Sequence, residues 1–148
     1  MNRSVREQLE LLNQQIKELV GVYRGAMGST NISENEFWIW YSLIMTDGAY
    51  SQQDICSMWS LPKQTVNTII VHMAKRELIT LEVVPGTRNR KIIRLTPSGK
   101  AYGESIVMPI ANAEQRAFAK LSGEDRTAFT QALGNYIALL KEEIHEIQ

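Results

Sequence analysis

Between Ser51 and Thr96 the hydrophobic residues change from a helical spacing to the pattern of β-strands, and this change limits the possible fold more than any other feature of the sequence. The helical part is interrupted at Ser60-Leu61-Pro62, because proline cannot donate the backbone hydrogen bond of a helix interior. The segment therefore predicts a short helix, a tight turn, a second helix and a two-stranded hairpin.

The first of these helices is predicted to open at Ser51, because Ser51-Gln52-Gln53-Asp54 has the form of a capping box. Its inner face is expected to carry Ile55, Met58 and Trp59, and Cys56 is expected to be a buried structural thiol.

The second helix is expected to begin at Pro62, since proline is well tolerated in the first turn of a helix, and to run to about Glu77. The side chains expected to point inward are Val66, Ile69, Ile70 and Met73.

Two β-rich runs, Ile79–Val84 and Lys91–Thr96, follow this helix. The residues between them, 85–90, form a tip that is basic and longer than a tight two-residue turn. We expect these runs to form an antiparallel hairpin.

Further helices are expected on both sides of this segment. Residues 5–25 carry one apolar stripe at steps of three and four, and Ser33 with Glu36 forms a second capping box before the apolar run Phe37–Met45, which is expected to lie centrally. A long helix should start at Thr96-Pro97, and a last helix has an apolar side. The members of that side are Phe129, Leu133, Tyr136, Ile137, Leu140 and Ile144.

The expected fold class is therefore mainly α, formally α+β, in a single domain of residues 1–148. The formal net charge of the chain is zero, but its distribution is uneven. Residues 60–100 hold eight basic and two acidic residues, a net of +6, which leaves −6 for the remainder. Such a division of charge suggests a cationic surface that faces a polyanion.

Two helices joined by a turn of about three residues form a helix-turn-helix, whose second helix enters the DNA major groove. Glutamine and asparagine can pair with adenine, and lysine can reach guanine or a phosphate. The alternative is an ordinary amphipathic helix with a polar outer face, and the basic hairpin makes this alternative less favoured. The candidate DNA-binding residues are Ser51, Lys63, Gln64, Thr65, Asn67 and Thr68, with Arg88, Asn89, Arg90 and Lys91 of the hairpin.

The stretch from Ser51 to Gly99 resembles the winged helix core of the MarR family. The most specific point is Leu95-Thr96-Pro97-Ser98-Gly99, which is similar to the family's Leu-Thr-x-x-Gly after the second strand of the wing. The resemblance implies a winged helix-turn-helix core at 33–99 and dimerisation helices at 5–25 and 100–147. It also implies a homodimeric, ligand-responsive repressor that binds double-stranded DNA at a pseudo-palindromic operator.

The sequence departs from the family pattern at two positions. Thr87 stands where the family usually has an aspartate that braces a wing arginine, which leaves open whether Arg88 or Arg90 enters the minor groove. Glu77 stands where a glycine usually follows the recognition helix, so this helix is expected to end with a different geometry.

The resemblance further implies a pocket for a small aromatic or phenolic effector. Its candidate residues are Tyr23, Trp38, Tyr41, Met45 and Trp59, for which a plain role in the core is the alternative.

No nucleophile and base, carboxylate pair or spaced metal ligands stand out, so neither an enzyme nor a cofactor nor a metal site is expected. The chain has no apolar leader and no apolar run long enough for a membrane span, so we expect it in the cytoplasm and not in a membrane. The alternative function is a winged-helix module for protein interaction, an antirepressor or scaffold with weak DNA binding.

Overall fold

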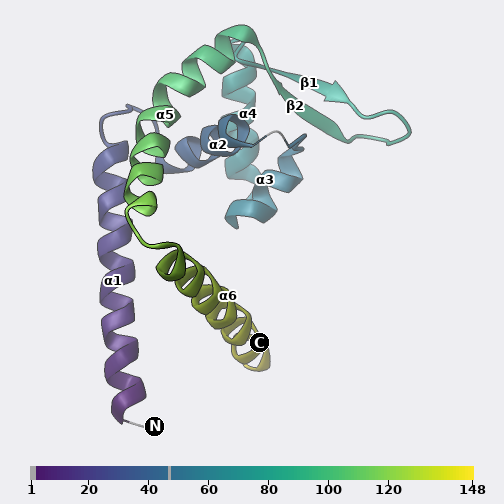
Figure 1. Ribbon diagram of the computed structural model, residues 1–148. Coiled ribbons are helices and arrows are strands. Elements are labelled where there is room, and N and C mark those ends of the chain that lie inside the picture. The colour runs from purple at the N-terminus through teal and green to yellow at the C-terminus, as the bar shows by residue number, and fades with distance from the viewer. Residues whose placement is uncertain (1–2, 47) are drawn as a thin grey trace. The chain divides into compact units, whose positions relative to one another are not determined.

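The computed structural model describes residues 3–46 and 48–148, which form helices and one hairpin (Figure 1). It divides into two compact units, residues 1–109 and 110–148, with the boundary inside α5 at Pro109. The elements are α1 (Arg3–Met27), α2 (Glu34–Met45), α3 (Gln52–Trp59), α4 (Lys63–Lys75), β1 (Ile79–Val83), β2 (Lys91–Leu95), α5 (Pro97–Ala119) and α6 (Gly123–Glu146).

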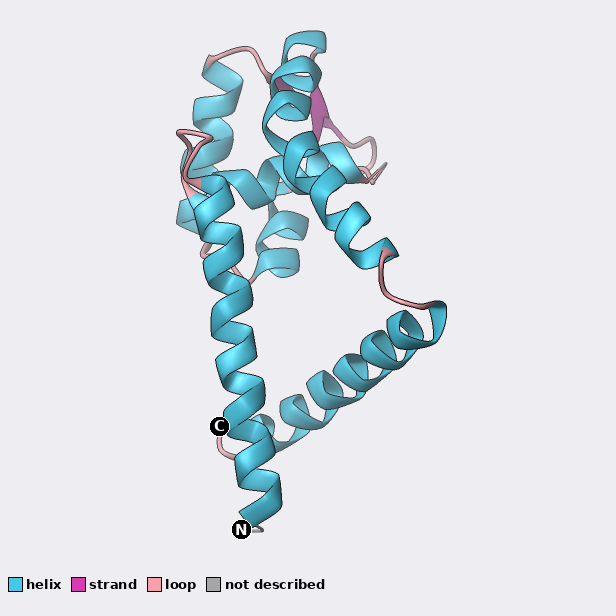
Figure 2. Ribbon diagram, turned by 60° about the vertical axis from the view of Figure 1, so that its left-hand side comes forward, coloured by secondary structure: helices cyan, strands magenta, loops and turns pink. Residues whose placement is uncertain are grey.

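The predicted order of elements is thus confirmed, and Figure 2 shows that the hairpin is the only extended structure among the described residues. β1 and β2 pair antiparallel in a register that places Ile79 opposite Leu95 and Val83 opposite Lys91. On the other edge of β2 the N–H of Ile93 donates to the carbonyl oxygen of Tyr50 at 2.8 Å, which fixes the hairpin to the segment that precedes α3.

The core of the first unit is built around α2, as its apolar composition predicted. Phe37, Ile39 and Trp40 are fully buried. The Ser33 hydroxyl accepts from the N–H of Glu36 at 3.1 Å and so caps the helix. The α3, α4, hairpin and α5 residues that complete this core are Ile55, Val66, Ile70, Met73, Ile79, Ile92, Ile93 and Val107.

Two expectations for α3 were wrong. Met58 is 44% exposed, and Cys56 is only half-buried. Successive helix residues are about 100° apart, so Cys56 and Met58 lie about 80° to either side of the line between Ile55 and Trp59. Both positions therefore fall at the rim of the face that α3 buries.

The end of α4 also differs from the expectation. Glu77 has φ +59, so the chain adopts the left-handed conformation that a glycine would favour, in spite of the side chain. The N–H of Leu78 donates to the carbonyl oxygen of Met73 at 3.1 Å, and that of Glu77 donates to the carbonyl oxygen of Ala74 at 3.0 Å. These are the bonds of a Schellman motif, so glutamate replaces glycine without changing how the helix ends.

The second unit consists of the end of α5 and α6. The Ser122 hydroxyl caps α6 by accepting from the N–H of Asp125 at 3.0 Å. None of the residues of α6 is buried, and its predicted apolar side is largely exposed. In the first unit α1 likewise exposes several large apolar side chains, which include Val5, Leu11, Ile16, Leu19 and Val22.

The close approach of α5 to the start of β1 generates a prediction. A Cβ on Gly99 would collide with the backbone carbonyl of Leu78, whereas a Cβ on Gly21 would meet no atom within 4 Å. We expect Gly99→Ala to lower the free energy of unfolding by about 1–3 kcal/mol, because the backbone has to move. Gly21→Ala is the control and is expected to stabilise by about 0.5–1 kcal/mol. Urea unfolding followed by circular dichroism measures both, and equal stabilities would contradict the expectation.

Candidate nucleic-acid interface

The outer face of α4 presents polar side chains and no carboxylate. Lys63, Gln64, Asn67 and Thr68 are exposed, and Thr65 is half-buried. The first turn of α4 contains no acidic residue, and no side chain caps its N–H groups. Uncapped N–H groups at a helix N-terminus favour an anion, so this end of α4 is suited to a phosphate.

Two candidate residues have internal roles. The Thr68 hydroxyl donates to the carbonyl oxygen of Gln64 at 3.0 Å. Ser51 is only 7% exposed, and its hydroxyl accepts from the N–H of Asp54 at 3.2 Å, while its own N–H donates to Asp54 Oδ2 at 2.9 Å. Because Ser51 is buried and forms the predicted capping box, we leave this residue out of the DNA-contacting set proposed below.

The loop of the hairpin, here called the wing tip (residues 85–90), extends beyond α3 and α4 and is exposed (Figure 1). Gly86 has φ +80, which allows the chain to turn. The Thr87 hydroxyl donates to the carbonyl oxygen of Val84 at 2.7 Å, and the N–H of Val84 donates to that of Arg90 at 2.9 Å. Thr87 therefore closes the loop and does not brace an arginine.

The arginines of the hairpin have different partners. Arg90 Nη2 lies 3.2 Å from Asp54 Oδ2 of α3, and Arg94 Nε lies 2.9 Å from Glu82 Oε2 of β1. Within the part of the chain that the structure describes, Arg88 has no ion pair. The pairing of Arg90 with Asp54 was missed by the sequence analysis, because 36 positions separate the two residues and no local pattern joins them.

The pKa of the Asp54 carboxyl lies below its ordinary value of 3.8. The largest cause is the hydrogen bond from the backbone N–H of Ser51, and the hydroxyl of Ser51 and the positive charge of Arg90 lower the pKa further. Partial burial opposes these effects. Asp54 is therefore a carboxylate at neutral pH, both as a helix cap and as a partner of the wing.

The structure gathers four of the five candidate effector residues around Trp38. Trp59 stacks on Trp38 with 4.8 Å between ring centroids, and Tyr41 and Tyr23 each lie 5.3 Å from it. The sequence analysis missed Phe37, whose ring lies 5.1 Å from Trp38. Met45, at the end of α2, is half-buried. The four clustered candidates are also half-buried, so parts of their rings remain accessible.

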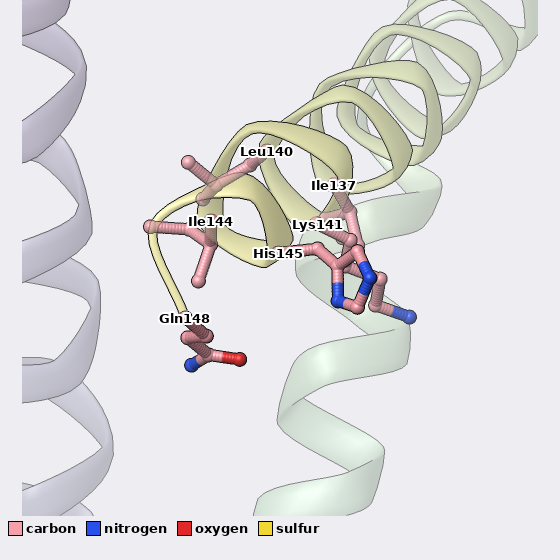
Figure 3. A pocket seen from close by; sticks show the side chains of 6 residues that line it. All are labelled: Ile137, Leu140, Lys141, Ile144, His145 and Gln148. Atoms are coloured by element: carbon pink, nitrogen blue, oxygen red, sulfur yellow. The ribbon is translucent and has the colours of Figure 1, made fainter.

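The sequence analysis did not predict the hollow that the structure shows in the second unit. It has a volume of about 450 Å³ and is lined only by α6 and the residues that follow it (Figure 3). Its lining side chains are Ile137, Leu140, Lys141, Ile144, His145 and Gln148. The hollow is therefore an apolar helix face and not a pocket enclosed by several elements.

Over the described ranges, no three His, Cys, Asp or Glu side chains come together in a group that could hold a metal ion. A helix long and apolar enough to cross a membrane is likewise not found in those ranges.

The comparisons with known proteins agree with this architecture. No family model matches the sequence. Over 90 residues, 61% of this chain and 57% of the relative, the chain is 26% identical to NicR, an HTH-type transcriptional repressor of Pseudomonas putida. The match thus spans less than two thirds of the length of that relative.

Two solved structures are similar over most or all of the chain. A MarR family regulator from Neisseria meningitidis has a TM-score of 0.82 and 27% identity, with full coverage of both chains. BpsR of Bordetella bronchiseptica, whose DNA binding is regulated by 6-hydroxynicotinic acid, has a TM-score of 0.62 and 22% identity over 86% of this chain and 90% of that one.

These findings define a mainly α winged helix-turn-helix protein, as the sequence predicted. The chain is similar to MarR family regulators in fold and sequence, which confirms the resemblance drawn from the stretch Ser51–Gly99.

The depressed pKa of Asp54 generates a prediction about pH. The ionised carboxylate stabilises the fold above the ordinary pKa of 3.8, and this stabilisation is lost as the pH falls through the lower folded-state pKa. We expect Asp54→Asn to destabilise the protein at pH 7 and to cost nothing below the folded-state pKa. Arg90→Gln is expected to raise the pKa of Asp54 only part of the way, because the backbone of Ser51 is the larger cause. An NMR titration of the carboxyl measures this, and a return to the ordinary value in Arg90→Gln would contradict it.

Proposed function

We propose that this chain is a non-enzymatic, sequence-specific DNA-binding transcriptional regulator that acts in the cytoplasm. The observation that carries the proposal is the outer face of α4, which is exposed, lacks carboxylates, and lies in one compact unit with the basic wing tip. NicR is a transcriptional repressor and BpsR binds DNA, and both relatives favour the same function.

In this proposal α4 enters the major groove with its N-terminal end foremost. Gln64, Thr65 and Asn67 read base edges, and Lys63 neutralises a phosphate or reaches guanine. The wing, with its exposed cations and Asn89, contacts the adjacent minor groove or the phosphates that flank it.

Two substitutions in α4 distinguish a side chain that contacts phosphate from one that contacts a base. Lys63→Ala is expected to weaken binding to all duplexes alike and to reduce the slope of log K against log salt by about 1, because one phosphate contact is lost. Asn67→Ala is expected to relax the preference at one base pair by about 1–3 kcal/mol. Selection from random duplexes, followed by titration at several salt concentrations, measures both effects.

The same titration distinguishes the alternative function. An Asn67→Ala variant that loses equal affinity for the selected and the random duplex would contradict a base-reading role. A wild-type protein with no salt-sensitive affinity for any duplex would favour the winged-helix module for protein interaction.

We further propose that the chain works as a homodimer. Large apolar side chains stand exposed along α1 and α6, and those of α6 border the hollow at its C-terminal end. Helix faces with many exposed large apolar side chains are uncommon on monomers and mark a protein interface. A twofold dimer would present two α4 helices about one turn of DNA apart, which matches a pseudo-palindromic operator.

Two substitutions in α6 test the proposed dimer. Leu140 is 43% exposed on the apolar side of α6, and Asn135 is exposed about 140° around the same helix. We expect Leu140→Glu to shift the protein from dimer to monomer and to lower its affinity for a two-half-site operator, because a charge is placed in the interface. Asn135→Glu introduces the same charge and should leave the dimer intact. Analytical ultracentrifugation reads both, and a monomeric wild-type protein would overturn the proposal.

The aromatic cluster around Trp38 is the proposed effector site. Its rings come from α1, α2 and α3, so a bound aromatic molecule would contact three helices of the winged-helix unit together. BpsR supplies the precedent, since a hydroxylated aromatic acid regulates its DNA binding. A small aromatic or phenolic ligand at this site would relieve repression by changing the spacing of the two wings.

A further inference from the structure

The wing is attached to the start of α3 at two points. The first is the backbone hydrogen bond from the N–H of Ile93 to the carbonyl oxygen of Tyr50, at 2.8 Å. The second is the ion pair of Arg90 with Asp54, at 3.2 Å. These two contacts lie on either side of the point where the wing tip enters β2, one at the last residue of the loop and one inside the strand.

The carboxylate of Asp54 is itself fixed. Its Oδ2 accepts both the N–H of Ser51, at 2.9 Å, and the guanidinium of Arg90, at 3.2 Å. Because the capping box holds the carboxylate against the first turn of α3, the ion pair restricts where the Arg90 guanidinium can lie.

The arginines of the hairpin thus fall into two groups. Arg90 and Arg94 are each paired with a carboxylate, of Asp54 and Glu82 respectively. Arg88 is exposed at the wing tip, and no acidic partner among the described residues neutralises its charge. An unpaired guanidinium on an exposed loop is available to the phosphates or the minor groove of a duplex, whereas a paired one must first lose its partner.

We propose that Asp54 is the positioning residue of the wing, which holds the Arg90 guanidinium against α3 so that Arg88 is the wing arginine that contacts DNA. The assignment of Arg88 rests on the DNA-binding function proposed above. The role of Asp54 in fixing the wing stands on the contacts of the free protein.

The direction in which Asp54→Asn changes the affinity for DNA distinguishes a positioning role of Asp54 from an effect of its charge alone. Asp54→Asn removes a negative charge, so a role through charge alone would make DNA binding tighter. A positioning role predicts weaker DNA binding in Asp54→Asn, because a wing that has lost its ion pair must be ordered when DNA binds. Glu82→Gln is the matched control, since it removes the same charge from the other ion pair of the hairpin.

The first measurement is the affinity for a selected duplex at several salt concentrations. We expect Arg88→Gln to lose at least about fivefold in affinity and to reduce the salt slope by about 1, because a direct contact is removed. Arg90→Gln and Asp54→Asn are expected to lose about two- to fivefold, the size of an exposed ion pair, with an unchanged slope. The double variant should lose no more than either single one, and Glu82→Gln should bind as tightly as the wild type or more tightly.

The second measurement needs no DNA. Amide hydrogen exchange at Ile93 reports the bond to Tyr50, and we expect it to be several-fold faster in Asp54→Asn and Arg90→Gln, but unchanged in Glu82→Gln. Ser51→Ala controls for the helix cap, since it removes the hydroxyl and keeps the Asp54 carboxylate. It should leave the exchange of Ile93 unchanged.

Each outcome decides one part of the proposal. An Arg90→Gln variant with a reduced salt slope, or an Asp54→Asn variant that binds as tightly as Glu82→Gln, would overturn the division of roles. Unchanged exchange at Ile93 in Asp54→Asn would overturn the positioning role. If the wild-type protein binds no duplex, the proposed function fails and the assignment of Arg88 fails with it, while the exchange rates still decide the role of Asp54.

Discussion

The winged-helix unit depends on the burial of Trp40 in α2. Its ring is fully buried, and its indole N–H donates to a carboxylate oxygen of Glu36 at 3.2 Å, so the burial leaves no polar atom unpaired. The ring meets Tyr102 of α5 edge-on at 5.4 Å, and the absence of a side chain at Gly103 makes room for it, since a Cβ there would lie 2.7 Å from Trp40 Cε3. The guanidinium of Arg76 lies 4.8 Å from the centre of the Tyr102 ring. This series of contacts connects the central helix to α5 and to the end of α4, and it thereby helps to set the position of α4.

Local signals in the sequence predicted most of this fold. The N-cap at Ser33, the capping box at Ser51, the break at Pro62 and the change of period after Glu77 all depend on neighbours a few residues apart, and each lies where it was expected. The reciprocal bond from Glu36 that would complete a capping box at Ser33 is not among the described contacts, and the Glu36 carboxylate accepts from the Trp40 indole N–H. What failed depends on packing and backbone geometry, which residue type and spacing do not specify. Met58 has a hydrophobic side chain at an apparently suitable spacing, but Ile55 is the one residue of the short α3 that is buried. Glu77 adopts a conformation that its own residue type disfavours, because the bonds at the end of α4 require it.

In the candidate site, too, local sequence predicted some features and missed others. The exposed side chains of α4 follow from helical periodicity alone, and four of the effector candidates cluster because α2 and its neighbours were identified correctly. The partner of Arg90 could not be predicted, since Asp54 already had a sufficient explanation as a helix cap and the contact between them exists only when the hairpin folds back on α3. The uneven charge of the sequence indicated a cationic surface, but it could not show that part of this charge is neutralised within the wing itself.

The stack of Trp38 on Trp59 has a practical consequence. The chain has three tryptophans, and Trp38, Trp40 and Trp59 all belong to the first unit. Intrinsic tryptophan emission is therefore a native reporter of the winged-helix unit, and a molecule that inserted beside Trp38 would quench it directly. The same signal is blind to events confined to α6, whose aromatic residues are Phe129 and Tyr136. Emission excited selectively from tryptophan would thus follow occupancy of the cluster without interference from the second unit.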